Sequence, residues 1–221
     1  VSDLRPQRLA LAQARYPAIA VTTDYTELFQ NPDIDAIAIS TPVSTHFDLA
    51  QQALRAGKHV LVEKPLTSSS EDALRLMEEA DKRKLLLMVD HTFVYTGAVR
   101  KIRELIDNGS LGDLYYFDSV RVNLGLFQQD VNVIWDLAVH DLAIMDYLLP
   151  QRPCAVSATG VSHVSGRHEN IAYITMFFAN SLIAHVHVNW LSPVKVRSTL
   201  VSGSQKMIVY DDMEPTEKVK V

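Results

Sequence analysis

The stretch that decides the fold is His59-Val60-Leu61-Val62-Glu63-Lys64-Pro65, an aliphatic run that leads directly into a charged pair and a proline. Gly57 precedes the run and Pro65 closes it, which predicts an interior strand of a parallel sheet, covered on both faces. Ligands of such sheets bind outside the carboxyl ends of the strands, where Lys64 stands. Pro65 excludes helical geometry at Lys64, so the lysine is held extended. The alternative is a solvated Glu-Lys pair in a loop.

A second motif is Trp135-Asp136-Leu137-Ala138-Val139-His140-Asp141, which opens an apolar segment that reaches Leu149. The spacing predicts one helix with a buried stripe that consists of Ala138, Leu142, Met145 and Leu149. Asp136 and His140 are i,i+4 neighbours on the opposite side, so both can point into a shared space. The alternative is an ordinary pair on a helix surface.

The first part of the chain alternates strand and helix patterns. Strands are predicted at 1–3, 19–22, 36–39, 59–62 and 85–89, and helices at 6–15, around Leu28, at 44–57 and from Ser70 onward. Asp24 and Ser44 are predicted as helix caps, and Ala73, Met77 and Ala80 as the inward side of the last helix. Such alternation predicts an α/β fold with a doubly wound parallel sheet.

From Asp90 onward the pattern changes. A helix that carries Val99, Ile102 and Ile106 is followed by long strand patterns, which are interrupted only by the helix around Asp136. These patterns predict an α+β domain with a mostly antiparallel sheet and helices on one face. We therefore expect a dinucleotide-binding domain over residues 1–92 and a second domain over 93–221.

Both ends are expected to be incomplete parts of these domains. A dinucleotide-binding domain opens with a strand and a Gly-x-Gly-x-x-Gly turn that holds the pyrophosphate, and no such turn stands before the first helix. The last residues, 217–221, read as a strand that has barely begun. We expect these 221 residues alone to bind NAD weakly.

Three motifs together carry a resemblance. Thr41-Pro42-Val43-Ser44-Thr45-His46 precedes Glu63-Lys64-Pro65, and Asp136 with His140 follows. In this order they resemble the glucose-fructose oxidoreductase / inositol dehydrogenase / MocA (Gfo/Idh/MocA) family of NAD(P)-dependent oxidoreductases, along nearly the whole chain. The region from His91-Thr92-Phe93 through residues 130–135 most resembles members that act on nucleotide-linked amino sugars.

The resemblance implies a cofactor site for NAD. Its expected residues are Asp3, Thr41, Pro42, His46, Glu63, Lys64 and Trp135. Asp3 would accept hydrogen bonds from the adenosine ribose and repel a 2'-phosphate, which favours NAD over NADP. The alternatives are an acid at a helix start for Asp3 and a surface histidine for His46.

The resemblance also implies a catalytic group made of Lys64, Asp136 and His140, which we expect to converge at the mouth of the cleft between the domains. A histidine suits proton transfer near neutral pH, and a fixed lysine would stabilise charge on the substrate oxygen. Arg121 and Asn123 share one strand face, which could meet substrate phosphate or merely water. His185 and His187 are half of a metal site, and no metal is predicted.

Composition narrows the partners. The chain has 221 residues, a net charge of -5 and no basic run, which argues against nucleic acid or an anionic membrane. No segment is long and apolar enough to span a bilayer, and no signal peptide is recognisable. The single cysteine, Cys154, is expected to pack in a strand and fits a reducing cytoplasm. A homo-oligomer formed through the open face of the second sheet is expected.

Three functions follow from these observations. The first is an NAD-dependent oxidoreductase that oxidises a secondary alcohol of a sugar, nucleotide-linked rather than free. The second is a dehydrogenase of the same family that acts on a free cyclitol or aldose. The third is a catalytically silent binding or assembly protein, which the missing glycine turn supports and the retention of Lys64, Asp136 and His140 opposes.

Overall fold

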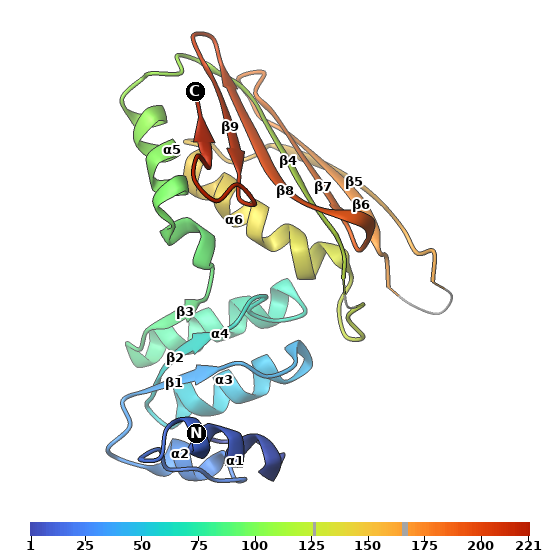
Figure 1. Cartoon of the computed structure of the whole chain (residues 1–221). Helices are drawn as coiled ribbons and strands as arrows, with labels where there is room; N and C mark the ends of the chain where they lie inside the picture. Colours follow the sequence, from blue (N-terminus) through green and yellow to red (C-terminus); the bar gives the residue numbers. More distant parts are fainter. Residues whose placement is uncertain (126, 165–167) are drawn as a thin grey trace. The chain divides into compact units, whose positions relative to one another are not determined.

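A computed structural model of the chain describes residues 1–125, 127–164 and 168–221 (Figure 1). The chain divides into two compact units, Val1–Asp90 and His91–Val221. The division falls close to the predicted boundary after residue 92.

Unit 1, residues Val1–Asp90, is built on a three-stranded parallel sheet in the order β1-β2-β3. Its strands are β1 (Ala36–Ile39), β2 (His59–Val62) and β3 (Leu87–Val89), and its helices are α1 (Pro6–Arg15), α2 (Thr26–Gln30), the 3-10 turn η1 (Val43–Thr45), α3 (His46–Arg55) and α4 (Ser70–Arg83). The strands predicted at 1–3 and 19–22 are reduced to one parallel bridge between Ser2 and Thr22. The parallel pairing of β1, β2 and β3 confirms the predicted Rossmann-like sheet.

The helix starts of unit 1 differ from the prediction in detail. The α4 helix begins at Ser70, as predicted, and is capped by Ser69, whose Oγ accepts from the Asp72 N–H at 3.1 Å. Ser44 lies inside η1, so it does not cap α3. Asp24 precedes the start of α2, although its Oδ1 accepts from the Thr26 N–H at 2.9 Å.

The hydrophobic core of unit 1 lies between one face of the sheet and the helices. Val60 and Val62 are buried there, whereas Leu61, on the other face of β2, is 37% exposed. The expectation that β2 is covered on both faces is therefore wrong for the described chain, because α3 and α4 pack against each other on the same side. In α4 the buried residues are Leu76 and the predicted Ala80, whereas Met77, which was also predicted inward, is 52% exposed.

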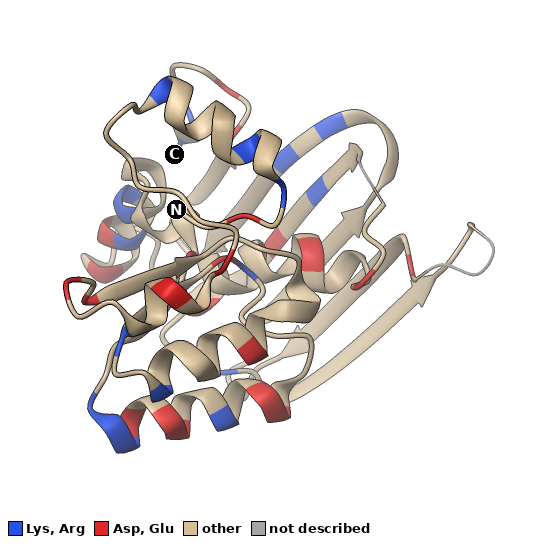
Figure 2. Ribbon diagram, turned by 90° about the horizontal axis from the view of Figure 1, so that it is seen from below, with Lys and Arg blue, Asp and Glu red and all other residues tan. Residues whose placement is uncertain are grey.

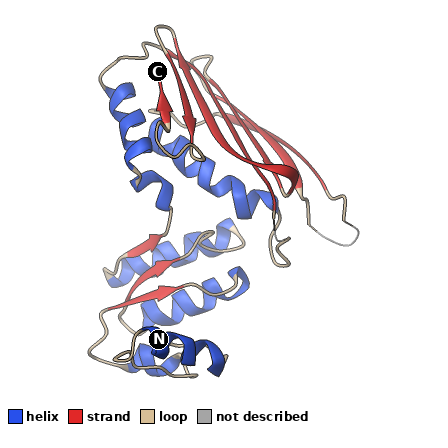
Figure 3. Cartoon of the chain, in the orientation of Figure 1, coloured by secondary structure: helices blue, strands red, loops and turns tan. Residues whose placement is uncertain are grey.

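Unit 2, residues His91–Val221, holds a seven-stranded sheet in the order β10-β9-β8-β4-β7-β6-β5 (Figure 3). Its strands are β4 (Leu114–Leu124), β5 (Ala155–Val161), β6 (Ile171–Phe177), β7 (Ile183–Asn189), β8 (Leu191–Gly203), β9 (Met207–Asp211) and β10 (Val219–Lys220). Every neighbouring pair is antiparallel except β4 with β7. The mostly antiparallel second sheet is confirmed.

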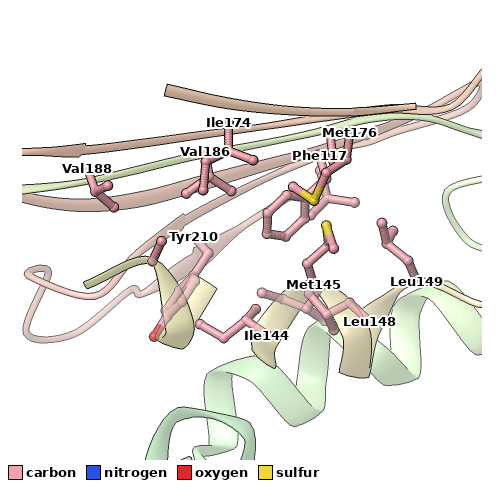
Figure 4. Close-up of a cluster of buried hydrophobic side chains, with 14 of the residues drawn as sticks. Phe117, Ile144, Met145, Leu148, Leu149, Ile174, Met176, Val186, Val188 and Tyr210 are labelled. Atoms are coloured by element: carbon pink, nitrogen blue, oxygen red, sulfur yellow. The ribbon is translucent and has the colours of Figure 1, made fainter. Parts of the chain in front are cut away.

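The helices of unit 2 cover one face of this sheet. They are the 3-10 turn η2 (Thr92–Tyr95), α5 (Gly97–Asp107), the π-helix η3 (Ile134–Ala138) and α6 (Val139–Leu148). Figure 4 shows Ile144, Met145 and Leu148 of α6 pointing toward sheet residues such as Phe117 and Val186. The opposite face is left open, and Cys154 is exposed, contrary to its predicted packing role.

The segment from Ile134 to Leu148 is not the single α-helix that its pattern predicts. Its first turn is a π-helix, whose wider i→i+5 turn rotates the following residues relative to a continuous α-helix. Within α6 the buried face also includes Asp141, whereas Leu142, which was predicted there, is half-buried. The predicted burial of Ala138, Met145 and Leu149 is observed.

Figure 2 shows charged residues of both signs in both units, in keeping with a net charge of only -5. Within the described ranges, no helix has the length and apolar character required to cross a bilayer.

Candidate functional site

The predicted lysine motif lies where the sequence places it within unit 1. Thr41 follows β1 and Glu63-Lys64 follow β2, so both stand at the carboxyl ends of neighbouring parallel strands. The Glu63 N–H donates to the Ile39 carbonyl at 2.9 Å, which keeps the end of β2 in register with β1. Lys64 is half-buried, and its peptide bond to Pro65 is cis.

His46 connects the two loops at this end of the sheet. It is 1% exposed, with Nδ1 2.8 Å from the Pro65 carbonyl oxygen and Nε2 2.9 Å from the Thr41 carbonyl oxygen. Both partners are acceptors, so both hydrogen bonds are donated at once only when both ring nitrogens carry protons. The surface-histidine alternative is wrong. Because both ring nitrogens face the backbone, His46 holds Thr41 and the loop Glu63-Lys64-Pro65, the lysine loop, together.

Asp3 is engaged at the start of α1. Its Oδ1 accepts from the Arg5 N–H at 2.8 Å and from Arg5 Nε at 3.3 Å, and its Oδ2 lies 3.6 Å from Arg8 Nη1. The hydrogen bond from the Arg5 backbone, followed by the Arg5 side chain, lowers the pKa of Asp3. These contacts fit the helix-start alternative, and the contact with a ribose stays a prediction.

In unit 2, Asp136 is anchored by a residue that the sequence analysis did not single out. The indole Nε1 of Trp190 donates to Asp136 Oδ2 at 2.9 Å, and Trp190 is 1% exposed between β7 and β8. A tryptophan that points into a core needs an acceptor for its N–H. A tryptophan at the end of a buried strand pattern could therefore have indicated such a contact from the sequence. Asp136 and its partner Trp190 join the π-helix to the sheet.

The turn that presents Trp135 and Asp136 is also held at its start. Asn132 Oδ1 accepts from the backbone N–H groups of Ile134 at 3.1 Å and Trp135 at 3.2 Å. Its Nδ2 donates to Glu169 Oε2 at 3.1 Å. The N–H groups of a first helical turn have no partner within the helix, so a side-chain amide there stabilises the start of η3. Trp135 itself is half-buried.

His140 lies one turn beyond Asp136 and is half-buried. Its ring meets Phe93 edge-on, with 5.0 Å between the ring centroids and an interplanar angle of 73°. Lys64 belongs to unit 1, whereas Asp136 and His140 belong to unit 2, so the convergence of these three side chains stays a prediction.

Arg121 lies on the helix-covered face of the sheet, which corrects the expectation of a polar face toward substrate or water. Its side chain is 5% exposed; Nε is 2.7 Å from Asp141 Oδ2, and Nη2 is 3.2 Å from Asp141 Oδ1. The two-nitrogen contact expected for a phosphate is therefore made to a carboxylate of the chain itself. Asn123 is half-buried on the same strand, and its contact with substrate stays a prediction.

His185 and His187 lie on the open face of the sheet. Tyr173 stacks on both rings, at 6.0 Å from the His185 centroid and 4.4 Å from the His187 centroid. Burial, and then the neighbouring His185, lower the pKa of His187. Across the described residues, no group of three or more His, Cys, Asp or Glu side chains is arranged to hold a metal ion.

A parallel sheet with a lysine after the carboxyl end of a strand, followed in the chain by a mostly antiparallel sheet, is an arrangement found in two-domain oxidoreductases with a nucleotide cofactor. Residues 1–91 match the oxidoreductase family with an NAD-binding Rossmann fold, and residues 99–209 match the GFO/IDH/MocA C-terminal domain. The chain belongs to the Gfo/Idh/MocA family.

Curated relatives include two dehydrogenases. The 1-carboxy-3-chloro-3,4-dihydroxycyclo hexa-1,5-diene dehydrogenase of Comamonas testosteroni is 32% identical over 196 residues, which are 84% of this chain and 49% of the relative. The UDP-N-acetylglucosamine 3-dehydrogenase of Acidithiobacillus ferrooxidans is 34% identical over 157 residues, 70% of this chain and 48% of the relative. The chain thus spans about half the length of the curated relatives it matches.

Solved structures show the same fold. GenD2 from gentamicin A biosynthesis, solved with NAD, has a TM-score of 0.91 at 24% identity, over 98% of this chain and 65% of GenD2. The WlbA dehydrogenase from Bordetella pertussis, solved with NADH and UDP-GlcNAcA, has a TM-score of 0.87 at 18% identity, over 95% of this chain and 64% of WlbA.

Proposed function

We propose that the protein to which this chain belongs is an NAD-dependent dehydrogenase that oxidises a secondary alcohol of a sugar, with nucleotide-linked sugars as the preferred class. The observation that carries the proposal is the lysine loop at the carboxyl end of β2, held to the neighbouring β1 loop by the buried ring of His46. A lysine fixed at that edge of a parallel sheet lies where ligands of such sheets bind.

The loops that follow β1 and β2 suit a dinucleotide. Thr41 and Pro42 are exposed and Lys64 is half-buried, so these side chains are available to a ligand beside the sheet. We assign the nicotinamide side of the cofactor to Thr41, Pro42, Glu63 and Lys64, with Trp135 as a further contact and Asp3 at the adenosine ribose. NAD, when bound, accepts the hydride that leaves the carbinol carbon.

The protein's own residues would handle the proton. Hydride departure from a carbinol carbon requires the hydroxyl proton to leave, so a base must stand within hydrogen-bond reach. His140 is the proposed base, since the ordinary pKa of histidine lies near neutral pH. Lys64 would stabilise negative charge on the substrate oxygen. Asp136, immobilised by Trp190, would orient the imidazole or the substrate.

The finer choice of substrate rests on two relatives. One is named for a UDP-linked amino sugar, and WlbA was solved with UDP-GlcNAcA. A free cyclitol or aldose is the second candidate within the same chemistry. The expectation that Arg121 supplies a phosphate contact does not support the choice, because Arg121 is buried and its Nε and Nη2 already donate to Asp141.

We also propose that copies of the protein associate through the open face of the unit 2 sheet. Apolar side chains on this face stay exposed, among them Phe177 at 43% and Ile183 at 40%. They come from neighbouring strands, because Phe177 pairs with Ile183 in the register of β6 and β7. Exposed apolar side chains that adjoin one another mark an interaction surface more often than isolated ones do.

The test is kinetic. Lys64→Ala and His140→Ala are each expected to lower kcat about a hundredfold or more, the usual range for acid-base groups, and to change KM much less. Lys101→Ala, which removes an exposed lysine on α5, is the control and should leave kcat unchanged. Initial rates of NADH formation with nucleotide sugars, free inositol and free aldoses would also rank the substrates. Near-normal turnover of both variants would refute the catalytic assignment.

A further inference from the structure

A buried ion pair under α6 has no part in the proposed mechanism. The side chains of Arg121 and Asp141 are 5% and 2% exposed, and Asp141 Oδ1 also accepts from Ser119 Oγ at 2.7 Å. Moving two charges out of water costs free energy that an apolar pair of similar size would not cost. Stability alone therefore does not account for this pair. Its second effect is to fix the positions of the side chains that pack against it.

The guanidinium of Arg121 lies over an aromatic ring. Its Cζ is 4.5 Å from the centroid of Phe93, and Cζ of Arg197 is 5.7 Å from the same centroid. The planar fork of Arg121 is fixed by two hydrogen bonds to Asp141, so the surface that it offers to the ring is fixed as well. Phe93, in the short η2 turn, is thus held from the side of the sheet.

The edge of Phe93 in turn meets His140. The two ring centroids are 5.0 Å apart at 73°, the edge-to-face arrangement that aromatic rings favour. His140 also directly precedes Asp141 in α6, so the ion pair that restrains Asp141 restrains the rotation of the helix that bears the imidazole. The imidazole is therefore restrained twice, through its backbone and through its ring.

We propose that Phe93, backed by the Arg121–Asp141 pair, is a positioning residue that sets the orientation of the His140 imidazole. The inference rests on the proposed function, in which His140 accepts the proton. Arg121 and Phe93 act through His140 and need not touch the substrate. A misplacement of about 1 Å at a reacting group can cost about a hundredfold in rate, so such restraint has a measurable effect.

The experiment compares Phe93→Leu, Phe93→Tyr and Arg121→Lys with the unchanged protein. Phe93→Leu keeps apolar volume and removes the ring, Phe93→Tyr restores the ring, and Arg121→Lys keeps the charge opposite Asp141 but removes the planar stack. The readouts are kcat, KM and the proton chemical shifts of the His140 imidazole, which are sensitive to the ring current of Phe93. His140→Gln identifies the His140 signals.

We expect Phe93→Leu and Arg121→Lys to move the His140 signals and to lower kcat by about tenfold or more, with KM within about twofold. Phe93→Tyr should return both the signals and kcat toward the original values. A purely structural role would lower the unfolding temperature without this division between kcat and KM.

Arg103→Lys is the matched control. Arg103 also pairs with a carboxylate, with Nε 2.8 Å from Asp107 Oδ2, and its Cζ lies 5.8 Å from the Tyr147 centroid, but it meets α6 near the end of that helix, whereas His140 lies at its start. This change should leave kcat and the His140 signals where they are. If it moves them as much as Arg121→Lys does, the inference is overturned.

Two other outcomes separate the inference from the proposed function. If His140→Gln abolishes turnover while Phe93→Leu changes neither the His140 signals nor kcat, the positioning role is overturned and the proposed function stands. If His140→Gln retains normal turnover, the proposed function is overturned, and the positioning role in catalysis is overturned with it.

Discussion

At the scale of single residues, buried polar side chains with defined partners fix the orientation of the groups that they contact. Trp190 donates to Asp136, and Arg121 donates to Asp141. A buried polar atom that loses its partner retains the full cost of leaving water, so each such contact ties one orientation to folding. The side chain of Asp136 therefore has an orientation before any ligand arrives.

Replacing Trp190 with phenylalanine tests this contact. The change keeps an aromatic ring in the core and removes the N–H that reaches Asp136 Oδ2. We expect a loss of about 1.5–3 kcal/mol in the free energy of unfolding, the range for a hydrogen bond to a charged group, measured by urea denaturation. Trp135→Phe is the control, since Trp135 is half-buried. Equal losses in the two variants would show that ring size, and not the hydrogen bond, is responsible.

At the scale of elements, unit 1 depends on the loops at one end of its sheet. The β1 loop and the lysine loop come from different crossovers, and His46, the first residue of α3, bonds to a carbonyl in each of them. The parallel sheet brings the ends of β1 and β2 together. His46 then links the two loops that follow these strands, through the carbonyls of Thr41 and Pro65.

His46→Leu should therefore weaken unit 1. The carbonyls of Pro65 and Thr41 lose the ring that contacts them, and a neutral imidazole donates to one of them at a time, which predicts a loss of about 1–3 kcal/mol in the free energy of unfolding. His46→Asn can retain one of the two hydrogen bonds and should lose less. Hydrogen exchange of the β2 amides, for example that of Val62, would measure the local effect. Unchanged exchange in His46→Leu would contradict the role of His46 as a link between the loops.

The open face of the unit 2 sheet should respond to acid through His187. Burial and the nearby His185 lower the pKa of His187, while Asp118 opposes them. A lowered pKa in the folded state means that the unfolded chain takes up the proton first. Stability from this group is thus complete above the ordinary value of about 6.5 and is lost as the pH falls through it toward the folded value.

His187→Phe removes this titration and keeps a ring against Tyr173. We expect the unfolding temperature of the variant to fall less than that of the unchanged protein when the pH is lowered from about 7 to about 5. Thermal unfolding followed by circular dichroism at several pH values measures the difference. Parallel curves for the two proteins would show that His187 does not contribute.

At the scale of the whole molecule, the proposed association through the open sheet face predicts a concentration-dependent mass. Phe177→Glu places a charge among the exposed apolar side chains of this face, and a buried unpaired charge is costly, so we expect a lower oligomeric state. Leu86→Glu, at a residue that is 72% exposed in unit 1, is the control. Sedimentation velocity of the three proteins gives the masses. The proposal fails if Phe177→Glu keeps the mass of the unchanged protein.

The order and type of the elements could be predicted from the sequence, because the hydrophobic period of a strand or helix is a local property of the chain. The apolar run at β2 predicted a parallel strand that is followed by Lys64, and the alternating patterns after Asp90 predicted a mostly antiparallel sheet. The π-helical turn at Ile134–Ala138 and the burial of Asp141 were missed, because a single wider turn and a charged residue in a core leave no simple period in the sequence.

The partners of the buried polar groups were decided only by the tertiary structure. His46 bonds to a carbonyl 19 residues away, Arg121 pairs with a carboxylate 20 residues away, and Trp190 reaches Asp136 across 54 residues. Periodicity reports which side of an element is buried, but not which group of another element it meets there. A hydrogen bond requires two atoms within about 3 Å, and that distance is set by the packing of whole elements.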